Sequence, residues 1–161
     1  MDATRSQPTE LGAWAARRPD AEAVVIVDPD STRPAERITY AALDADADAN
    51  RLARALRRAG LRRGDRVAFV LGNEPAVFTV FWAAMRTGLY VVPVSRHLLA
   101  AEIRYILEDA TVSAVIGSEA GAAAWPDAAT GLPGLRLTLT VGETLEAALA
   151  DEAADPVADA E

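Results

Sequence analysis

Three consecutive residues, Ser95, Arg96 and His97, combine a hydroxyl, a guanidinium and the only imidazole of the chain. They follow the apolar run 89–94, which has the two-sided pattern of a buried parallel strand, and precede a segment with helical spacing. Ligands collect at the carboxyl ends of parallel strands, where amides of the following helix attract anions. The loop is therefore a candidate site for a phosphate or carboxylate, and an ordinary solvent-facing connection is the alternative.

A second motif, Gly-Ser-Glu-Ala-Gly at 117–121, also follows an apolar run. A hydrolase elbow needs a glycine two residues before the serine and a histidine later in the chain. Ser118 has neither, because Ile116 stands at the first position and His97 precedes it. The pattern favours Ser118 as a cap of a following helix. No complete catalytic set can be assembled, so we assign no catalytic residue.

Composition excludes several kinds of chemistry. All 16 basic residues are arginine, there is no cysteine, and His97 is the only histidine. The chain therefore has no disulfide framework, no thiolate nucleophile and too few ligands for a closed zinc or copper site, so we predict no metal site. A chain without lysine can form no Schiff base and has no phosphate-loop lysine.

Charge and hydropathy limit the partners and the location. The net charge is −8, which argues against nucleic-acid binding, and all of it comes from residues 111–161, since residues 1–110 are balanced. The first residues lack the apolar core of a secretory signal. The longest uncharged run, 75–85, is too short to span a membrane. We expect a cytoplasmic protein without a transmembrane segment.

Alternating strand and helix patterns predict an α/β fold, a mostly parallel sheet with helices on both faces. We expect a hairpin at the edge of the sheet from residues 23–27 and 36–40. The other expected strands are 66–71, 89–94, 112–116 and 135–141. The expected helices are 11–17, 39–59, 74–87 and 100–109, with a weak alanine-rich helix before the last strand.

The helix expected over 39–59 has the clearest signals. Thr39 is a plausible N-cap and Gly60 the left-handed stop, while aspartates precede arginines along the segment as the helix dipole favours. Its arginines indicate a solvated face, and an anion-binding patch is the alternative.

Two regions differ in character. We assign residues 1–142 to one α/β subdomain. Residues 143–161 contain seven acidic and no basic residues, and we assign them to an acidic linker or tail in which 144–150 forms two helical turns.

Five stretches resemble AMP-forming acyl-CoA synthetases of the adenylate-forming AMP-binding superfamily, in their amino-terminal portion. Residues 38–43 and 50–73 are similar to the first core motif and its sequel. Residues 85–94 resemble the second core motif, in which a helix ends at glycine and a strand at proline. Residues 97–109 and 114–118 are similar to the next helix and strand.

This resemblance implies a ligase of fatty acid metabolism that uses ATP, Mg²⁺ and coenzyme A as a full-length protein. Such a ligase activates a carboxylic acid as an acyl-adenylate and then forms a thioester. Ser95, Arg96 and His97 stand where some relatives have a loop near the nucleotide end of coenzyme A, although no diagnostic motif of that loop is preserved here. The phosphate loop and the catalytic lysine are absent from this chain, so we expect it to be an inactive fragment that lacks its carboxyl-terminal portion, with no cofactor of its own. The alternatives are a non-catalytic α/β binding or complementation module, and a gene remnant.

Overall fold

Four parallel strands form the central sheet, in the order β4-β3-β5-β6. The strands are β3 (Arg66–Val70), β4 (Tyr90–Pro93), β5 (Ala114–Gly117) and β6 (Leu137–Thr140). The computed structural model describes residues 11–27, 34–118 and 123–157. The chain divides into two compact units, residues 1–46 and 47–161, and the sheet belongs to the second.

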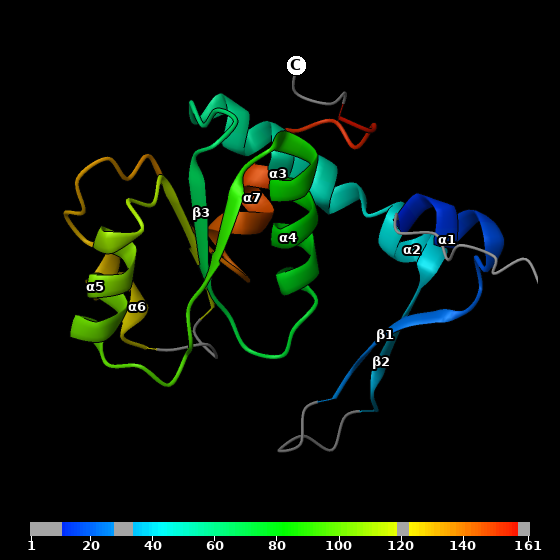
Figure 1. Ribbon diagram of the computed structural model, residues 1–161, viewed down its shortest axis with the longest axis horizontal. Helices are drawn as coiled ribbons and strands as arrows, with labels where there is room; N and C mark the ends of the chain where they lie inside the picture. Colours follow the sequence, from blue (N-terminus) through cyan, green and yellow to red (C-terminus); the bar gives the residue numbers. More distant parts are fainter. Residues whose placement is uncertain (1–10, 28–33, 119–122, 158–161) are drawn as a thin grey trace, which may run out of the picture. The chain divides into compact units, whose positions relative to one another are not determined.

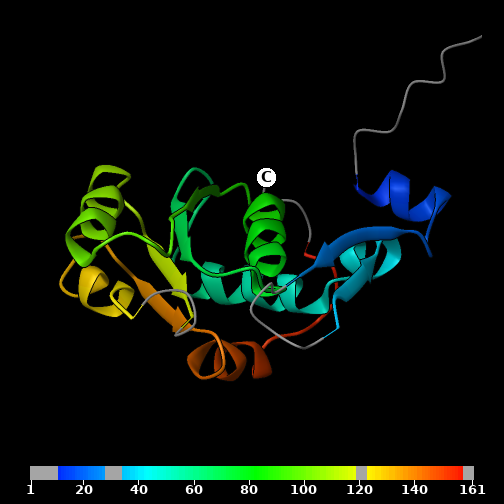
Figure 2. The same cartoon turned by 90° about the horizontal axis from the view of Figure 1, so that it is seen from below.

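Helices cover both faces of this sheet, as the sequence predicts (Figure 1). On one face lie α3 (Ala47–Arg58), α4 (Ala76–Thr87) and α7 (Thr144–Ala150). On the other lie α5 (Ala100–Asp109) and α6 (Trp125–Ala129). The view from below shows the same separation (Figure 2).

Strand β3 shows how the sequence builds two cores. Val67 packs in the cluster that contains α3 and α4, and Ala68 packs in the cluster that contains α5 and α6. Phe69 and Val70 repeat this alternation, because successive side chains of a strand point to opposite faces. A strand buried on both faces needs an apolar residue at every position, which is the pattern seen in the sequence.

Each face of the sheet has a tryptophan on one of its helices. Trp125 of α6, 1% exposed, is the largest buried side chain of the α5–α6 core. Trp82 lies on α4, where it makes an edge contact with Phe81 at a centroid separation of 5.2 Å. The two tryptophans of the second unit therefore stand on opposite sides of the sheet.

The first unit contains α1 (Leu11–Arg17), β1 (Glu22–Ile26), β2 (Glu36–Thr39) and α2 (Tyr40–Asp44). Trp14 stacks on Tyr40 with ring centroids 5.8 Å apart. The expected hairpin is present, since β1 and β2 pair antiparallel, but its expected place at the edge of the sheet is wrong: the two strands form a sheet by themselves. Neither strand has a fully buried residue, so the hairpin is only half covered.

The helix expected over 39–59 is divided in two. Thr39 Oγ1 accepts a hydrogen bond from the Ala42 amide at 3.2 Å, as a cap should, and α2 ends at Asp44. After a break at 45–46, α3 begins directly behind Asp46, a residue type favoured at helix starts. The expected stop is confirmed, because Gly60 has a φ of +88°.

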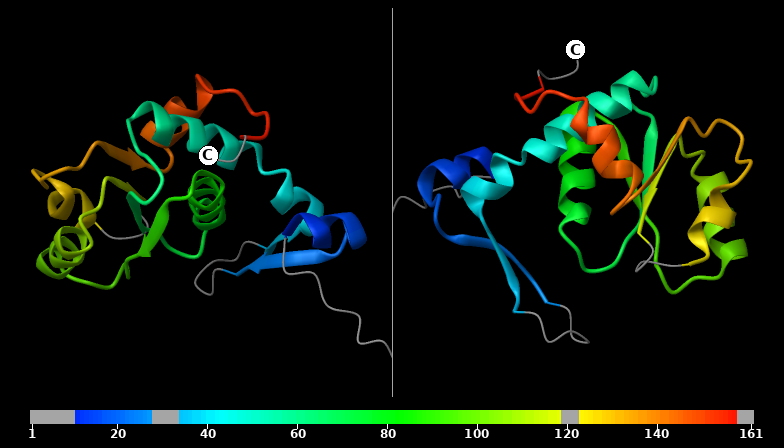
Figure 3. Two further views of the ribbon diagram at one scale, coloured as in Figure 1. Left: turned by 45° about the horizontal axis from the view of Figure 1, so that its top comes forward. Right: turned by 180° about the vertical axis from the view of Figure 1, so that it is seen from behind.

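The acidic segment that begins at 143 is partly built into the core. Leu145 and Leu149, one helical turn apart, are buried in the cluster that contains α3. Figure 3 shows α7 (orange) running beside α3. The expected helical turns over 144–150 are confirmed, and they belong to the packed α/β body rather than to an exposed tail.

Candidate functional site

The loops that follow β3, β4 and β5 leave the sheet at its carboxyl edge. From β3 the chain crosses to β4 on one side, and then to β5 and β6 on the other. The strand order therefore reverses between β3 and β5. In open α/β sheets ligands bind outside the carboxyl ends of the strands at such a point.

Ser95, Arg96 and His97 lie in the loop between β4 and α5, and all three are exposed. The preceding residue anchors the loop, because the Val94 amide donates to the Phe69 carbonyl at 2.9 Å. Within the loop, the His97 amide donates to Ser95 Oγ at 3.3 Å. The loop therefore lies at the carboxyl edge of the sheet, as the sequence predicts. The role of these residues in binding remains a prediction.

Arg96 reaches from this loop toward the end of β3. A Cβ built on Gly72 would lie 3.7 Å from a guanidinium nitrogen of Arg96 and 3.7 Å from Oε1 of Glu74. A cation from one loop and an anion from another therefore flank the same backbone position. Both distances are ordinary van der Waals contacts, so a small side chain at position 72 would fit between the two charged groups.

Glu74 and Ser118 join the loops after β3 and β5, a pairing that the sequence analysis missed. Glu74 Oε1 accepts from Ser118 Oγ at 2.7 Å and from the Gly72 amide at 2.9 Å. Ser118 is buried, and its own amide donates to the Val70 carbonyl at 3.2 Å. Both residues closely follow strands, a signal that becomes useful only once β3 and β5 are known to be neighbours.

The expected helix-cap role of Ser118 is wrong. Helix α6 begins at Trp125 with Ala124 as its preceding residue, and the Ser118 hydroxyl donates to Glu74 instead. Of the expected motif at 117–121, the last three residues lie outside the described part of the chain. Packing explains the glycine at position 117, because a Cβ built there would lie 2.3 Å from the Trp125 ring.

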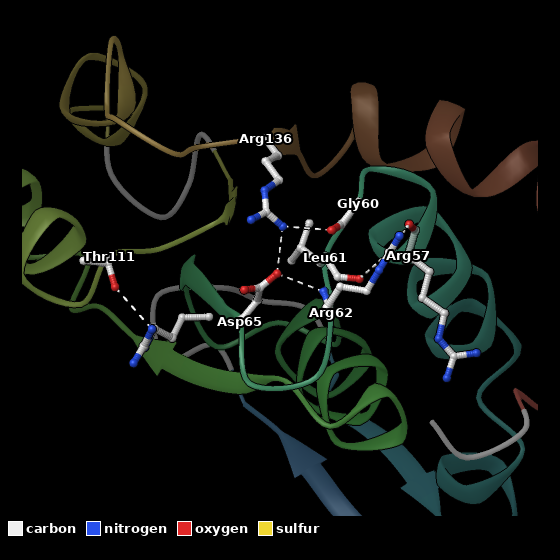
Figure 4. A network of polar contacts seen from close by, with 8 residues as sticks. Arg57, Gly60, Leu61, Arg62, Asp65, Thr111 and Arg136 are labelled. Carbon is white, nitrogen blue, oxygen red and sulfur yellow. Dashed lines mark hydrogen bonds and ion pairs between the residues drawn. The ribbon is translucent and has the colours of Figure 1, made fainter. Parts of the chain in front are cut away.

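The amino edge of the sheet carries a different kind of network (Figure 4). Arg136 Nη1 donates to Asp65 Oδ2 at 2.7 Å and to the Gly60 carbonyl at 2.8 Å, and the Arg62 amide donates to the same Asp65 oxygen at 2.8 Å. The hydrogen bond from Arg62 is the main cause that lowers the pKa of Asp65; burial opposes it and Arg136 adds to it. These contacts join the loop before β3 to the segment before β6. We therefore assign this network to the stability of the fold rather than to ligand binding.

The carboxyl edge supplies one guanidinium and one imidazole that suit an anionic group.

Within 11–27, 34–118 and 123–157, no group of three His, Asp or Glu side chains is placed to hold a metal ion. In those same ranges, every helix is too short or too polar to cross a lipid bilayer.

Comparisons with known proteins agree with this fold. Residues 11–159 match the AMP-binding enzyme family. A long-chain-fatty-acid–CoA ligase, FadD13, from Mycobacterium tuberculosis (strain ATCC 25618 / H37Rv) is 38% identical over 80 residues, which is 50% of this chain and 16% of the ligase. A feruloyl-CoA synthase from an Amycolatopsis species is 36% identical over 110 residues, which is 66% of this chain and 21% of the synthase.

A solved structure, the inhibitor-bound amino-terminal domain of FACL13 from Mycobacterium tuberculosis, superposes with a TM-score of 0.73 and 30% identity. The superposition covers 92% of this chain and 36% of that domain. The chain thus spans about a fifth or less of the two curated relatives that it matches. Since the family match extends over nearly all of its length, the chain belongs to the AMP-binding enzyme family and corresponds to an amino-terminal portion of its acyl-CoA synthetases.

Proposed function

We propose that this chain is the amino-terminal part of a ligase that activates a carboxylic acid with ATP and passes the acyl group to coenzyme A. The match over residues 11–159, shared with acid–CoA ligases, carries this proposal. Such a ligase first forms an acyl-adenylate and releases pyrophosphate, and a thiol then displaces AMP. The enzyme would work in the cytoplasm, where both cosubstrates are available.

Within this reaction we assign Ser95, Arg96 and His97 to the nucleotide end of coenzyme A. The loop is exposed at the carboxyl edge of the sheet, and a guanidinium binds phosphate through charge-assisted hydrogen bonds. When bound, coenzyme A supplies the thiol that accepts the acyl group. Arg96 would neutralise a phosphate, and the Ser95 hydroxyl would hold the loop through its bond to the His97 amide.

The 161 residues alone would not form an acyl-adenylate. Adenylate transfer requires cations placed around the developing charge, and the catalytic lysine that the family uses for this has no counterpart in a chain without lysine. ATP, together with the Mg²⁺ that its phosphates carry, would therefore bind mainly to the remainder of the ligase.

Carboxylate-dependent exchange of pyrophosphate into ATP tests both statements. The chain alone should give no exchange. A chimera in which these residues replace the matching part of FadD13 should restore exchange and produce acyl-CoA, whereas FadD13 lacking that part should not. Exchange by the isolated chain would refute its inactivity, and a folded chimera without exchange would refute the ligase assignment.

A further inference from the structure

One face of α3 holds the polypeptide segment 152–157, which we name the strap. Three residues spaced by four positions, Asn50, Arg54 and Arg58, carry the donors of this face. Residues four apart lie one above the other on a helix. They therefore form a row along which a chain segment can lie, and the strap follows that row after α7 ends at Ala150.

Arg54 makes the central contacts with the strap. Its Nη1 donates to the carbonyls of Ala153 at 2.8 Å and Asp155 at 2.6 Å, and its Nη2 lies 3.5 Å from the Pro156 carbonyl. One guanidinium thus engages three carbonyls of the strap, whose backbone bends at Asp155. A planar fork of several N–H donors is suited to this geometry, and an ammonium group is not.

Asn50 supplies the neighbouring contact from a buried position. Its Nδ2 donates to the Ala154 carbonyl at 2.9 Å, and its Oδ1 accepts from Arg86 Nη1 of α4 at 2.8 Å. Only 6% of Asn50 is exposed. Because a buried amide without partners is costly, the bond from Arg86 fixes the orientation in which Asn50 meets the strap.

Both ends of the strap are also fastened. Arg58 Nη1 lies 3.1 Å from Glu152 Oε1, and the side chain of that glutamate is only 12% exposed. At the other end, Val157 packs against the core cluster that contains α3. The strap is therefore held over its whole length, and the acceptors along its centre are all backbone carbonyls.

We propose that Asn50 and Arg54 are positioning residues that fix the direction in which the chain leaves the α/β body after residue 157. This inference rests on the proposed function, because it assumes that the rest of the ligase follows there. Carbonyl groups are present whatever the side chain. We call the hydrogen bonds from Asn50 and Arg54 to the strap carbonyls the anchor. The side chains of 153–155 can therefore vary without loss of the anchor, whereas α3 must keep its two donors.

Spin labels test the anchor in the 161-residue chain, which has no cysteine of its own. Labels at Asp155→Cys on the strap and Ala101→Cys on α5, both exposed positions, should give a narrow distance distribution by pulsed electron resonance. Arg54→Ala should broaden it, and Arg54→Lys should restore it only in part. The matched control is Arg51→Ala on the same helix, whose side chain pairs with Asp48 at 2.8 Å.

A strap variant, Ala153→Ser, should keep the narrow distribution because its carbonyl remains. The anchor is refuted if Arg54→Ala leaves the distribution narrow, or if Ala153→Ser broadens it as much. Circular dichroism of each variant confirms that the α/β body stays folded, so that broadening reports release of the strap.

The chimera with FadD13 tests the positioning role. Arg54→Ala should lower kcat about tenfold or more with little change in KM, because small displacements of catalytic groups are costly. Arg51→Ala should leave kcat unchanged. If the chimera with native residues at these positions is inactive, the proposed function is contradicted, and the spin-label experiment still tests the anchor independently. If the chimera is active and its Arg54→Ala variant keeps full kcat, only the positioning role is contradicted.

Discussion

Arg136 and Asp65 are separated by 71 residues in sequence, and their side chains meet at 2.7 Å. Arg136 directly precedes β6 and Asp65 directly precedes β3, while β5 lies between these two strands in the sheet. The ion pair therefore ties together the amino ends of strands that do not contact each other through a ladder of hydrogen bonds.

The ionised Asp65 carboxylate, which is stabilised mainly by the Arg62 amide and also by Arg136, should make stability depend on pH. The folded pKa of Asp65 lies below its ordinary value of 3.8, so the ionised carboxylate stabilises the fold above that value and this contribution is lost as the pH falls through the folded pKa. Asp65→Asn should lower the melting temperature at neutral pH, and its difference from the native chain should shrink as the pH falls below 3.8. Asp109→Asn, at an exposed position, is the control. A pH-independent difference would contradict this interpretation.

Gly117→Ala should destabilise the second unit. The added Cβ would lie 2.3 Å from the buried Trp125 ring, so the ring or the strand must shift, at a cost of about 1–3 kcal/mol. Gly72→Ala is a matched control at the end of β3, where the nearest atoms are 3.7 Å away, and it should change stability by less than about 1 kcal/mol. Urea denaturation measures both, and equal effects would count against a close Gly117–Trp125 contact.

Glu74 and Ser118 should show energetic coupling. Their hydrogen bond at 2.7 Å joins the loops after two neighbouring strands, and a bond to a charged acceptor contributes about 1.5–3 kcal/mol. In a double-mutant cycle of Glu74→Ala and Ser118→Ala, the two losses should therefore sum to more than the loss in the double variant. Glu74→Gln keeps an acceptor and should cost less than Glu74→Ala. Strictly additive losses would show that the bond does not contribute.

Leu145→Ala should strongly lower the free energy of unfolding if α7 belongs to the core. Leu145 is 4% exposed, and removing a buried leucine side chain costs about 2–5 kcal/mol. Leu99→Ala, at a residue that is 72% exposed, should change the free energy of unfolding by less than about 0.5 kcal/mol. If both variants unfold at the same urea concentration, α7 does not support the sheet.

Arg96→Ala should weaken the use of coenzyme A by the chimera with FadD13. Loss of one charge-assisted bond to a phosphate predicts an increase in KM for coenzyme A of roughly tenfold. Exchange of pyrophosphate into ATP should stay unchanged, since the thiol takes no part in that step. Arg104→Ala, which breaks an exposed pair with Glu108 at 2.8 Å, provides the control. An unchanged KM would remove Arg96 from the proposed site.

Local signals predict much of this fold. The spacing of apolar residues gives helix 100–109 with its observed bounds, and Thr39 and Gly60 mark helix ends where expected. These features depend on neighbours within a few residues, so that they can be read from one stretch of sequence. The break at 45–46 is different, because the apolar spacing continues across it.

Contacts between distant segments are harder to predict. Nothing in the sequence around Glu74 or Ser118 shows that β3 and β5 are neighbours, and their hydrogen bond depends on that order. The strap is similar: an acidic, alanine-rich segment has the composition of a linker, and only the side chains of α3, about a hundred residues earlier, explain why it is held. The exposed loop at 95–97 could be found because it follows a single recognisable strand.

The positions of Trp14, Trp82 and Trp125 give the protein three natural fluorophores in separate environments. Trp14 stacks in the first unit, Trp82 lies on a helix of one sheet face, and Trp125 is sealed in the core of the other face. Variants that retain one tryptophan at a time therefore allow each layer to be followed by its own emission. Whether the layers melt together or one after another then becomes a directly observable property of this fold.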